Sequence, residues 1–304
     1  MASLGYTLLL VLTAFIWGSG FVAQVEGNAF GPFAFSCIRC LIAAGFLALV
    51  FKGLDTLGKS PRRPRSREET KLLWKAGLFC GLALCTAMNL QQLGMYLGTS
   101  AGKSGFLTAC YIVLVPVVGL FLGQKNSIKT WACVAITVAG LYLLCIKEDF
   151  SFELSDGVSL LCALVFSFHI LVIDKYVNRV DPIRLSCIQF LTIGVLTAPL
   201  MAVFDLKFPA MDFSVVTAAF MNPRAVAGLL FAAFCSSGIA YTLQIVAQDK
   251  VKPAIASLTM SLESVFAVFA GWFILGEQLT AREMTGCAIM MTAIVGAQIK
   301  IDRP

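Results

Sequence analysis

Long runs of apolar residues alternate along the chain with short breaks that contain charged, glycine or proline residues. A run of about 20 apolar residues is long enough for an α-helix to cross the hydrocarbon core of a bilayer. The pattern predicts ten membrane-spanning helices, at about residues 4–24, 30–51, 76–96, 104–123, 130–146, 155–173, 183–204, 225–247, 254–275 and 281–299. We therefore expect an all-α polytopic membrane protein embedded in a lipid bilayer.

The composition excludes a soluble enzyme. Hydrophobic residues make up 59% of the 304 positions and charged residues 13%, against about 45–50% and about 25% in ordinary soluble domains. The first apolar run is expected to stay as a helix, because no basic residue precedes it as in a cleaved leader. All 11 cysteines lie inside apolar runs, where thiols usually serve as small packing residues. Cys37 and Cys40 have the Cys-x-x-Cys (CxxC) spacing of some metal and redox sites, but no second pair of ligand residues accompanies them. We therefore predict no metal site and no cofactor.

The basic residues orient the predicted helices. If the N-terminus is cytoplasmic, the cytoplasmic segments hold 17 Lys and Arg residues, the outer segments hold 5, and Arg39 lies inside a helix. This bias follows the positive-inside rule and predicts that both termini are cytoplasmic. The densest basic segment, 52–75, is interpreted as a topology signal on a solvated loop rather than as a patch for nucleic acid or anionic lipid. No nucleic-acid partner is expected.

The two halves of the chain resemble each other. Segment 32–41 aligns without gaps with 182–191, and the Pro, Ser, Cys, Ile and Leu residues of the two segments coincide. Further matches join 76–78 to 227–229 and 122–124 to 275–277. The sequence thus predicts two repeats of five helices, 1–147 and 148–304. Because five is odd, the second repeat is inverted, as in many secondary transporters, whose substrates bind near the midplane between the halves.

Several motifs resemble the EamA family of the drug/metabolite transporter (DMT) superfamily. They occur in order along nearly the whole chain: Phe15-Ile-Trp17-Gly18-Ser19-Gly20-Phe21, Pro32 with Arg39 and Leu41-Ile-Ala43-Ala44, Leu107 to Pro116, and Ser261-Leu262-Glu263-Ser264-Val265-Phe266 with Leu275-Gly276-Glu277. The resemblance implies a ten-helix fold with a central cavity that exports or imports small metabolites such as amino acids. Ser264 departs from the family pattern, which usually carries a helix-kinking Pro there.

Two stripes of polar residues occupy matching helix faces. The third helix carries Cys85, Asn89, Gln92 and Tyr96, and the eighth carries Ser237, Tyr241, Gln244 and Gln248. In hydrocarbon such side chains need a partner or a water-filled cavity. One interpretation is that Asn89, Gln92, Tyr96, Tyr241 and Gln244 line a substrate cavity. The alternative is hydrogen bonding between helices, which is common in membrane bundles.

Three ionisable groups, Arg39, His169 and Glu263, fall inside the predicted helices. Glu263 is a candidate proton site or a counter-ion for a substrate ammonium group, and a fixed Arg39–Glu263 ion pair is the alternative. His169 is a candidate proton relay or a residue with one hydrogen bond. Trp17 is a candidate cavity residue or a packing residue, and the glycines beside it permit close approach of another helix or a substrate.

These features predict a secondary transporter of small polar or amphipathic, amino-acid-like metabolites that acts by alternating access in the cytoplasmic (plasma) membrane. Gly98 to Ser104 lacks the glycine spacing of a phosphate-binding loop, so gradients are expected to supply the energy, with proton coupling as one hypothesis. Export of drugs or lipophilic cations is an alternative. A non-transporting membrane enzyme or lipid-handling protein is disfavoured, because the chain has a single His and a single mid-helix carboxylate. No catalytic residue is predicted. Direction, substrate identity and oligomeric state stay open.

Overall fold

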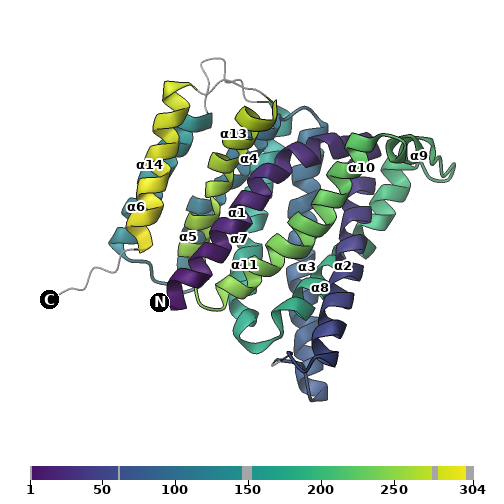
Figure 1. Ribbon diagram of the computed structural model, residues 1–304, viewed down its shortest axis with the longest axis horizontal. Coiled ribbons are helices and arrows are strands. Elements are labelled where there is room, and N and C mark those ends of the chain that lie inside the picture. Colours follow the sequence, from purple (N-terminus) through teal and green to yellow (C-terminus); the bar gives the residue numbers. More distant parts are fainter. Residues whose placement is uncertain (1, 61, 146–152, 276–279, 299–304) are drawn as a thin grey trace.

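The computed structural model describes residues 2–60, 62–145, 153–275 and 280–298, and within these ranges the chain forms helices and no strand. The helices pack side by side as one bundle (Figure 1). The prediction of an all-α fold is confirmed. The predicted boundary between repeats at 147/148, the Gly276-Glu277 part of the repeat motif, and Lys147, Lys300 and Arg303 lie outside the described residues.

The first half begins with two long helices. Its elements are α1 (Ala2–Gly27), the 3-10 turn η1 (Asn28–Phe30), α2 (Pro32–Thr56), α3 (Arg67–Tyr96), α4 (Ala101–Ala109), α5 (Tyr111–Phe121) and α6 (Ile128–Cys145). Helix α3 begins well before the predicted start at 76. Its N-cap is Ser66, whose hydroxyl accepts a hydrogen bond from the Glu69 backbone N–H at 3.1 Å. Such a cap stabilises a polar first turn outside the apolar span.

The second half repeats this order with two irregular stretches. Its elements are α7 (Leu154–Tyr176), the 3-10 turn η2 (Val177–Arg179), α8 (Pro182–Leu200), the π-helix η3 (Met201–Asp205), α9 (Ser214–Phe220), α10 (Pro223–Leu230), the π-helix η4 (Phe231–Ala240), α11 (Tyr241–Gln248), α12 (Pro253–Met260), α13 (Leu262–Leu275) and α14 (Ala281–Gln298). Helices α10, η4 and α11 run on without a break and form the eighth predicted span.

Eight of the described helical segments are long and apolar enough to cross a membrane, and Ile128–Leu144 is a shorter apolar helix. The tenth predicted span is α14, which lies beside α6 (Figure 1). Two glycines bring this pair together: a Cβ atom on Gly286 would lie 2.6 Å from the Gly140 carbonyl oxygen, and one on Gly140 would lie 2.9 Å from the Gly286 carbonyl oxygen. Small residues permit such close backbone contact between membrane helices.

Two of the predicted spans are interrupted near their middles. Cys110 separates α4 from α5, and Ser261 separates α12 from α13. The second interruption occurs without the Pro that the family pattern carries at position 264. There, the Ser264 hydroxyl donates a hydrogen bond to the Gly105 carbonyl oxygen of α4 at 3.3 Å. The two interrupted helices therefore contact each other across the centre of the bundle.

The packing of α2 against α8 shows the internal repeat directly. The Cys37 thiol donates to the Gly194 carbonyl oxygen, and the Cys187 thiol donates to the Ala44 carbonyl oxygen, both at 3.3 Å. Each residue of one bond lies 150 positions from its counterpart in the other. The same contact thus occurs twice, related by a pseudo-two-fold axis.

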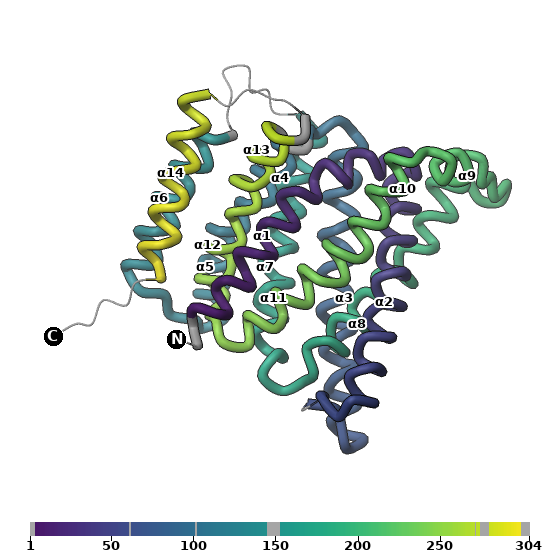
Figure 2. Tube along the Cα trace, in the orientation of Figure 1, coloured from purple at the N-terminus to yellow at the C-terminus, as the bar shows by residue number. Residues whose placement is uncertain are grey.

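Corresponding helices of the two halves run in opposite directions. The start of α1 meets the end of α14 through a hydrogen bond from Thr7 to Gln298 of 3.2 Å. The end of α7 lies near the end of α2. Arg62, in the loop after α2, donates a hydrogen bond to the carbonyl oxygen of Val177, the residue after α7, at 3.2 Å. Figure 2 shows α1 rising from the N-terminus at the lower end of the bundle, which is the end where α7 stops. The repeat is therefore inverted, as the odd number of helices per half requires.

Candidate substrate cavity

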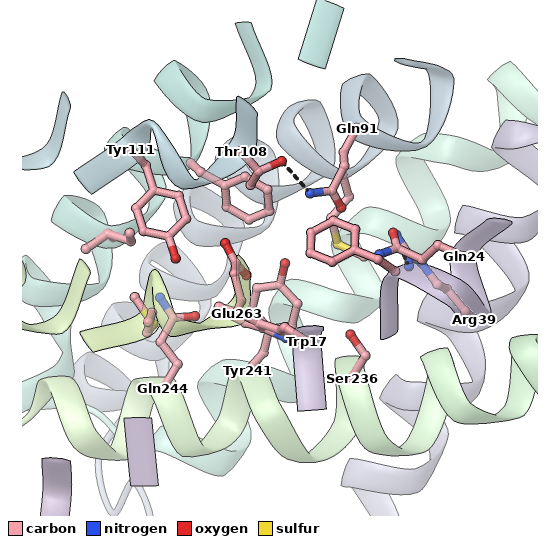
Figure 3. Close-up of a pocket in the computed structure, with 15 residues that line it drawn as sticks. Trp17, Gln24, Arg39, Gln91, Thr108, Tyr111, Ser236, Tyr241, Gln244 and Glu263 are labelled. Carbon is pink, nitrogen blue, oxygen red and sulfur yellow. Dashed lines mark hydrogen bonds between the residues drawn. The ribbon is translucent and has the colours of Figure 1, made fainter. Parts of the chain in front are cut away.

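A small cavity lies at the centre of the bundle, between the halves (Figure 3). Its volume of about 30 Å³ has room for roughly one or two water molecules. Both halves supply its wall, which consists of Trp17, Phe21, Gln24, Arg39, Met88, Gln91, Thr108, Tyr111, Phe166, Ile170, Ser236, Tyr241, Gln244, Met260 and Glu263. Phe21, Met88, Phe166, Ile170 and Met260 are the apolar part of this wall, and the other residues carry polar or charged groups.

Irregular backbone positions the polar part of the wall. Ser236 lies in the π-helix η4, Tyr241 begins α11, and Tyr111 begins α5 directly after the interruption at Cys110. The hydrogen bonds of a π-helix span one more residue than those of an α-helix, so the residues that follow are rotated relative to a regular helix. Non-helical backbone at membrane depth is tolerated where it is buried in protein or lines a cavity.

Glu263 lies in the first turn of α13 with 3% of its surface exposed. Its Oε1 atom has no hydrogen-bond partner, and the hydroxyls of Tyr111 and Tyr241 lie near the carboxylate in Figure 3. The N-terminal end of a helix favours a negative charge, which offsets part of the cost of burying this carboxylate. Gly18 allows α1 to approach here, because a Cβ atom on it would lie 2.5 Å from the Glu263 carbonyl oxygen.

Arg39 of α2 is 2% exposed. Its Nη1 atom donates to the Gln24 side-chain oxygen at 3.3 Å, and its guanidinium carbon lies 5.0 Å from the centre of the Phe35 ring. Its Nε and Nη2 atoms have no partner. A lone charge in a membrane helix costs roughly 2.5–3.5 kcal/mol on insertion scales. Nevertheless, in the part of the chain that the structure describes, no ion pair joins Arg39 to Glu263.

Trp17 and Tyr241 form the aromatic part of the wall. Their ring centres lie 4.6 Å apart at an angle of 54°, and the Tyr241 ring also contacts Phe190 at 5.5 Å and His169 at 6.0 Å. The indole N–H of Trp17 has no hydrogen-bond partner. Tyr241 thus links the cavity to the second half of the bundle.

His169 lies behind this wall and does not line the cavity. It is fully buried, and its Nε2 atom lies 3.2 Å from the Gln189 side-chain oxygen. Gln189 occupies the position in the second half that corresponds to Arg39 in the first. Among the described residues, this is the hydrogen bond that the His169 side chain makes.

The first-half stripe does not face the cavity. Asn89 donates to the Thr197 hydroxyl at 2.9 Å and to the Cys85 carbonyl oxygen at 2.9 Å, and Gln92 donates to the Asn28 side-chain oxygen at 2.7 Å. Tyr96 is 53% exposed. We expected these three residues in the cavity wall. The structure places them elsewhere because α3 turns this face toward α8 and toward the end of α1, where the polar groups bond to neighbouring helices.

Several wall residues were not anticipated from the sequence. Gln91, next to the expected stripe, donates to the Thr108 hydroxyl at 2.9 Å, and both line the cavity with Gln24, Tyr111 and Ser236. Gln24 and Gln91 are polar residues within apolar runs, and this pattern could have identified them as candidates for the cavity wall. Ser236, Thr108 and Tyr111 carry a weaker signal, because such residues occur throughout membrane helices.

The two halves contact each other through charged residues at both ends of the bundle. At the end that holds the start of α1, Arg62 forms a two-bond ion pair with Asp249 at 2.8 and 3.1 Å, and Arg184 pairs with Asp55 at 2.6 Å. At the opposite end Lys103 pairs with Asp156 at 2.5 Å.

The opposite end has a further contact between the halves. The Asp205 carboxylate accepts a hydrogen bond from the Ala34 backbone N–H at 2.5 Å. Asp205 and Ala34 occupy the positions of the two repeats that correspond to Asp55 and Arg184. The two halves therefore contact each other at both ends of the bundle.

Among the described residues, no cluster of three or more His, Cys, Asp or Glu side chains could hold a metal ion. Cys37 and Cys40 pack inside the bundle. The Cys37 thiol donates a hydrogen bond to the Gly194 carbonyl oxygen, and Cys40 is fully buried and forms no disulfide. The chemistry of the cavity is therefore that of hydrogen bonds, two separated charges and aromatic contacts.

Comparison with known proteins gives consistent matches over the whole chain. The chain is 28% identical over 295 residues to an uncharacterized transporter of Archaeoglobus fulgidus, covering 96% of this chain and 85% of that protein. It is 24% identical to the uncharacterized transporter YwfM of Bacillus subtilis, covering 95% and 92% of the two chains. A solved crystal structure has the same fold, with a TM-score of 0.75, 15% identity, and coverage of 97% and 96%. The model of the EamA-like transporter family matches twice, at residues 4–146 and 155–297. The chain is therefore a multi-pass membrane protein that belongs to the EamA-like transporter family of the DMT superfamily.

Proposed function

We propose that this protein is a secondary transporter that moves small polar or amphipathic, amino-acid-like metabolites across the cytoplasmic membrane by alternating access. The observation that carries the proposal is the small polar cavity between two inverted halves, which is where such transporters bind their substrates. At about 30 Å³ the cavity is too small for a metabolite. The halves must therefore separate at one end before a substrate can enter.

We further propose that both termini face the cytoplasm. The end of the bundle that holds the start of α1 also carries Arg62 and Arg184, and the basic loop 57–66 joins α2 to α3 there. This placement agrees with the excess of Lys and Arg that the positive-inside rule assigns to cytoplasmic loops. A protease-cleavable tag on the N-terminus should resist cleavage in intact cells and be cleaved in inverted membrane vesicles.

The energy for transport is proposed to come from a gradient, with proton coupling as the first hypothesis to test. In proteoliposomes, uptake that rises when the side bearing substrate is acidified would support it. Uptake that follows the substrate gradient alone at every pH would contradict it.

Counterflow in proteoliposomes tests the transport function without knowledge of the coupling ion. Vesicles are loaded with a mixture of unlabelled amino acids and metabolites, and uptake of each labelled compound is followed from outside. We expect uptake of at least one compound above that of empty vesicles. Uptake of lipophilic cations alone would show that the substrates are drugs or lipophilic cations instead of amino-acid-like metabolites. No uptake from a broad panel, with the protein shown to be folded, would overturn the transport function in favour of an enzyme or lipid-handling role.

A further inference from the structure

We propose that the exposed face of the first half of α3, residues 67–82, binds an anionic phospholipid. Arg67, Lys71 and Lys75 hold its phosphate group, and the apolar surface that follows them along the helix holds its acyl chains. The site is separate from the cavity between the halves and does not depend on the transport function.

The basic segment 52–75 is not one loop in the structure. Helix α2 continues to Thr56 and α3 begins at Arg67, so only residues 57–66 form the loop between them. Residues 67–75 are therefore the first turns of a helix. A topology signal requires only that basic residues lie on one side of the membrane. Their alignment on one helix face is an additional feature, which a solvated loop would not have.

Three basic residues follow one line along these turns. Arg67, Lys71 and Lys75 are four positions apart and therefore lie on the same face of α3, where they line one open groove of about 710 Å³. Like charges at this spacing repel each other. Lys71 pairs with Glu68 at 3.0 Å, whereas in the described part of the chain no carboxylate forms an ion pair with Arg67 or Lys75. An anionic group in the groove would relieve the repulsion.

The groove continues from the basic residues onto an apolar surface. Trp74 lines it beside the basic residues, and Leu78, Phe79 and Leu82 line it farther along the helix. Each of these four side chains is about half exposed. Tryptophan favours the boundary between lipid headgroups and hydrocarbon. This preference places the basic residues at the level of the headgroups and the leucines at the level of the acyl chains.

Two residues of the second half border the groove at Phe79. The Phe79 ring stacks on that of Tyr176 in α7, with ring centres 6.5 Å apart and planes at 10°. The Lys175 Nζ atom lies 5.7 Å from the centre of the Tyr176 ring. A further cation thus lies next to this edge. A lipid in the groove would lie beside the contact between α3 and α7, through which the two halves pack.

The combination of charges and apolar surface selects an anionic lipid. A soluble phosphate would leave the apolar part of the groove empty, and a zwitterionic lipid carries an ammonium group that the basic residues repel. In the proposed orientation this end of α3 faces the cytoplasm, whose leaflet carries anionic lipids. Each Lys or Arg beside such lipids strengthens binding by about fivefold.

Tryptophan fluorescence in bilayers tests the site at Trp74. The full chain with Trp17, Trp131 and Trp272 replaced by Phe keeps Trp74 as its one tryptophan. Bilayers contain equal amounts of phosphatidylglycerol and phosphatidylcholine with identical chains, and one of the two lipids carries bromine near the headgroup end of its chains. Bromine quenches a tryptophan that it contacts. We expect the quenching to report at least about a fivefold preference for phosphatidylglycerol at Trp74.

Native mass spectrometry of the unmodified protein gives a second measurement, which does not depend on the folding of the single-tryptophan chain. In detergent with equal amounts of the two lipids, the protein should retain phosphatidylglycerol in preference to phosphatidylcholine. Equal quenching by the two brominated lipids, or equal retention if the single-tryptophan chain does not fold, would overturn the proposal.

Trp272 supplies the matched control position. It lies on α13, is 51% exposed and does not line the groove. In a chain that keeps only Trp272, the two brominated lipids should quench equally. A preference for phosphatidylglycerol as large as that at Trp74 would show a general attraction of anionic lipids to the protein and would overturn the specific site.

Two double variants of the Trp74 chain assign the charges. Arg67→Gln with Lys75→Gln should remove most of the preference for phosphatidylglycerol. Lys59→Gln with Arg65→Gln removes the same charge from the neighbouring loop, outside the groove, and should keep the preference. An equal loss in both double variants would assign the effect to the total charge of this end and overturn the site.

Glu68→Gln and the soluble headgroup sharpen the test. Glu68→Gln releases Lys71 from its ion pair and should raise the preference at Trp74, whereas a lowered preference would contradict the role of Lys71. Glycerophosphoglycerol, which has the headgroup without acyl chains, should not displace the brominated lipid. Displacement by this compound would show that the basic residues bind a soluble phosphate diester and would overturn the assignment of the groove to a lipid.

Discussion

The two halves use corresponding polar helices for different purposes. In the first half, Asn89 and Gln92 on α3 bond to neighbouring helices. In the second half, Tyr241 and Gln244 on α11 face the cavity. Helix α3 is a regular α-helix, whereas α11 follows a ten-residue π-helix that changes the direction of the side chains after it. Similar residue types at matching positions therefore acquire different roles through backbone geometry.

The two buried charged residues of the cavity also differ between the halves. Arg39 of the first half corresponds to the neutral Gln189, and Glu263 of the second half corresponds to Cys110. Each half thus contributes one charge that the other lacks. An inverted repeat gives two halves with similar backbone arrangements. A substrate that is not itself symmetric nevertheless requires different side chains from each half. Under the proposed function, the specificity for such a substrate comes from these differences between the halves.

The largest effect is expected at Tyr241, on the second-half side of the comparison. Tyr241→Ala removes a ring that contacts Trp17, Phe190 and His169. We expect the KM for transport to rise about tenfold or more, equivalent to about 1.4 kcal/mol of lost binding, with protein level changing less. Tyr241→Phe, which keeps the ring, is the control and should retain most activity. Unchanged uptake kinetics for Tyr241→Ala would remove this residue from the site.

An effect on stability rather than on affinity is expected at the α3–α8 contact. A Cβ atom on Gly81 would lie 2.6 Å from the Thr192 Cβ atom and 3.0 Å from the Gln189 carbonyl oxygen. Gly81→Ala should destabilise the protein by roughly 1–3 kcal/mol, as overpacking does, measured as a lower Tm. Gly102→Ala is the control, because nothing lies within 4 Å of a Cβ atom there. Equal Tm values for the two variants would show that α3 and α8 separate readily.

Asn89 tests the structural role of the first-half stripe. Asn89→Ala removes the hydrogen bond to Thr197 and should cost about 0.5–1.5 kcal/mol of stability, with the KM unchanged. A double-mutant cycle with Thr197→Val isolates the shared interaction. A raised KM with an unchanged Tm would instead place Asn89 in substrate binding.

The smallest effect is expected at Arg62 and Asp249, which join the halves at one end. Burial raises the pKa of Asp249, but the hydrogen bonds from Arg62 and Lys250 outweigh it and hold the pKa below its usual range. A carboxylate with a lowered pKa in the folded state stabilises that state fully above about pH 4, and the contribution is lost as the pH falls through the lower value. The Arg62 side chain is 37% exposed, so the contact is worth less than about 1 kcal/mol.

Asp249→Asn should therefore lower the Tm slightly at pH 7. It should have no effect at a pH low enough to protonate the aspartate. Thermal unfolding of both proteins across pH 3–7, compared with Lys71→Gln as a control at an exposed ion pair within one helix, measures the difference. A Tm difference that stays constant over this range would exclude the ion pair as its cause.

The helices and the repeat were predictable because membrane burial imposes long apolar runs and because five helices are duplicated in sequence. Trp17 and Glu263 were also predictable as cavity candidates and Arg39 as a coupling or ion-pair candidate, since charged or amphipathic side chains in hydrocarbon need a reason to be there. Their position in one wall is now visible.

The direction of each polar stripe was not predictable. Asn89 and Gln244 are similar side chains on corresponding helices, and either role satisfies their hydrogen bonds. Sequence periodicity assumes a regular α-helix, and it contains no signal for the π-helix of η4 or for the interruption at Ser261, where the Pro of the family pattern is missing. Tyr111 could likewise be placed in the wall only once the interruption at Cys110 was known.

The contact between Asp205 and Ala34 has a consequence for synthesis of the protein. Asp205 caps the start of α2, where Gly31 offers no side chain, yet it lies in the other half of the chain. A ribosome completes α2 long before it makes Asp205, so the first half enters the membrane with this helix end unprotected. Newly made first halves are thus expected to be vulnerable to membrane proteases until the second half inserts beside them. Two halves expressed as separate polypeptides should protect each other from degradation.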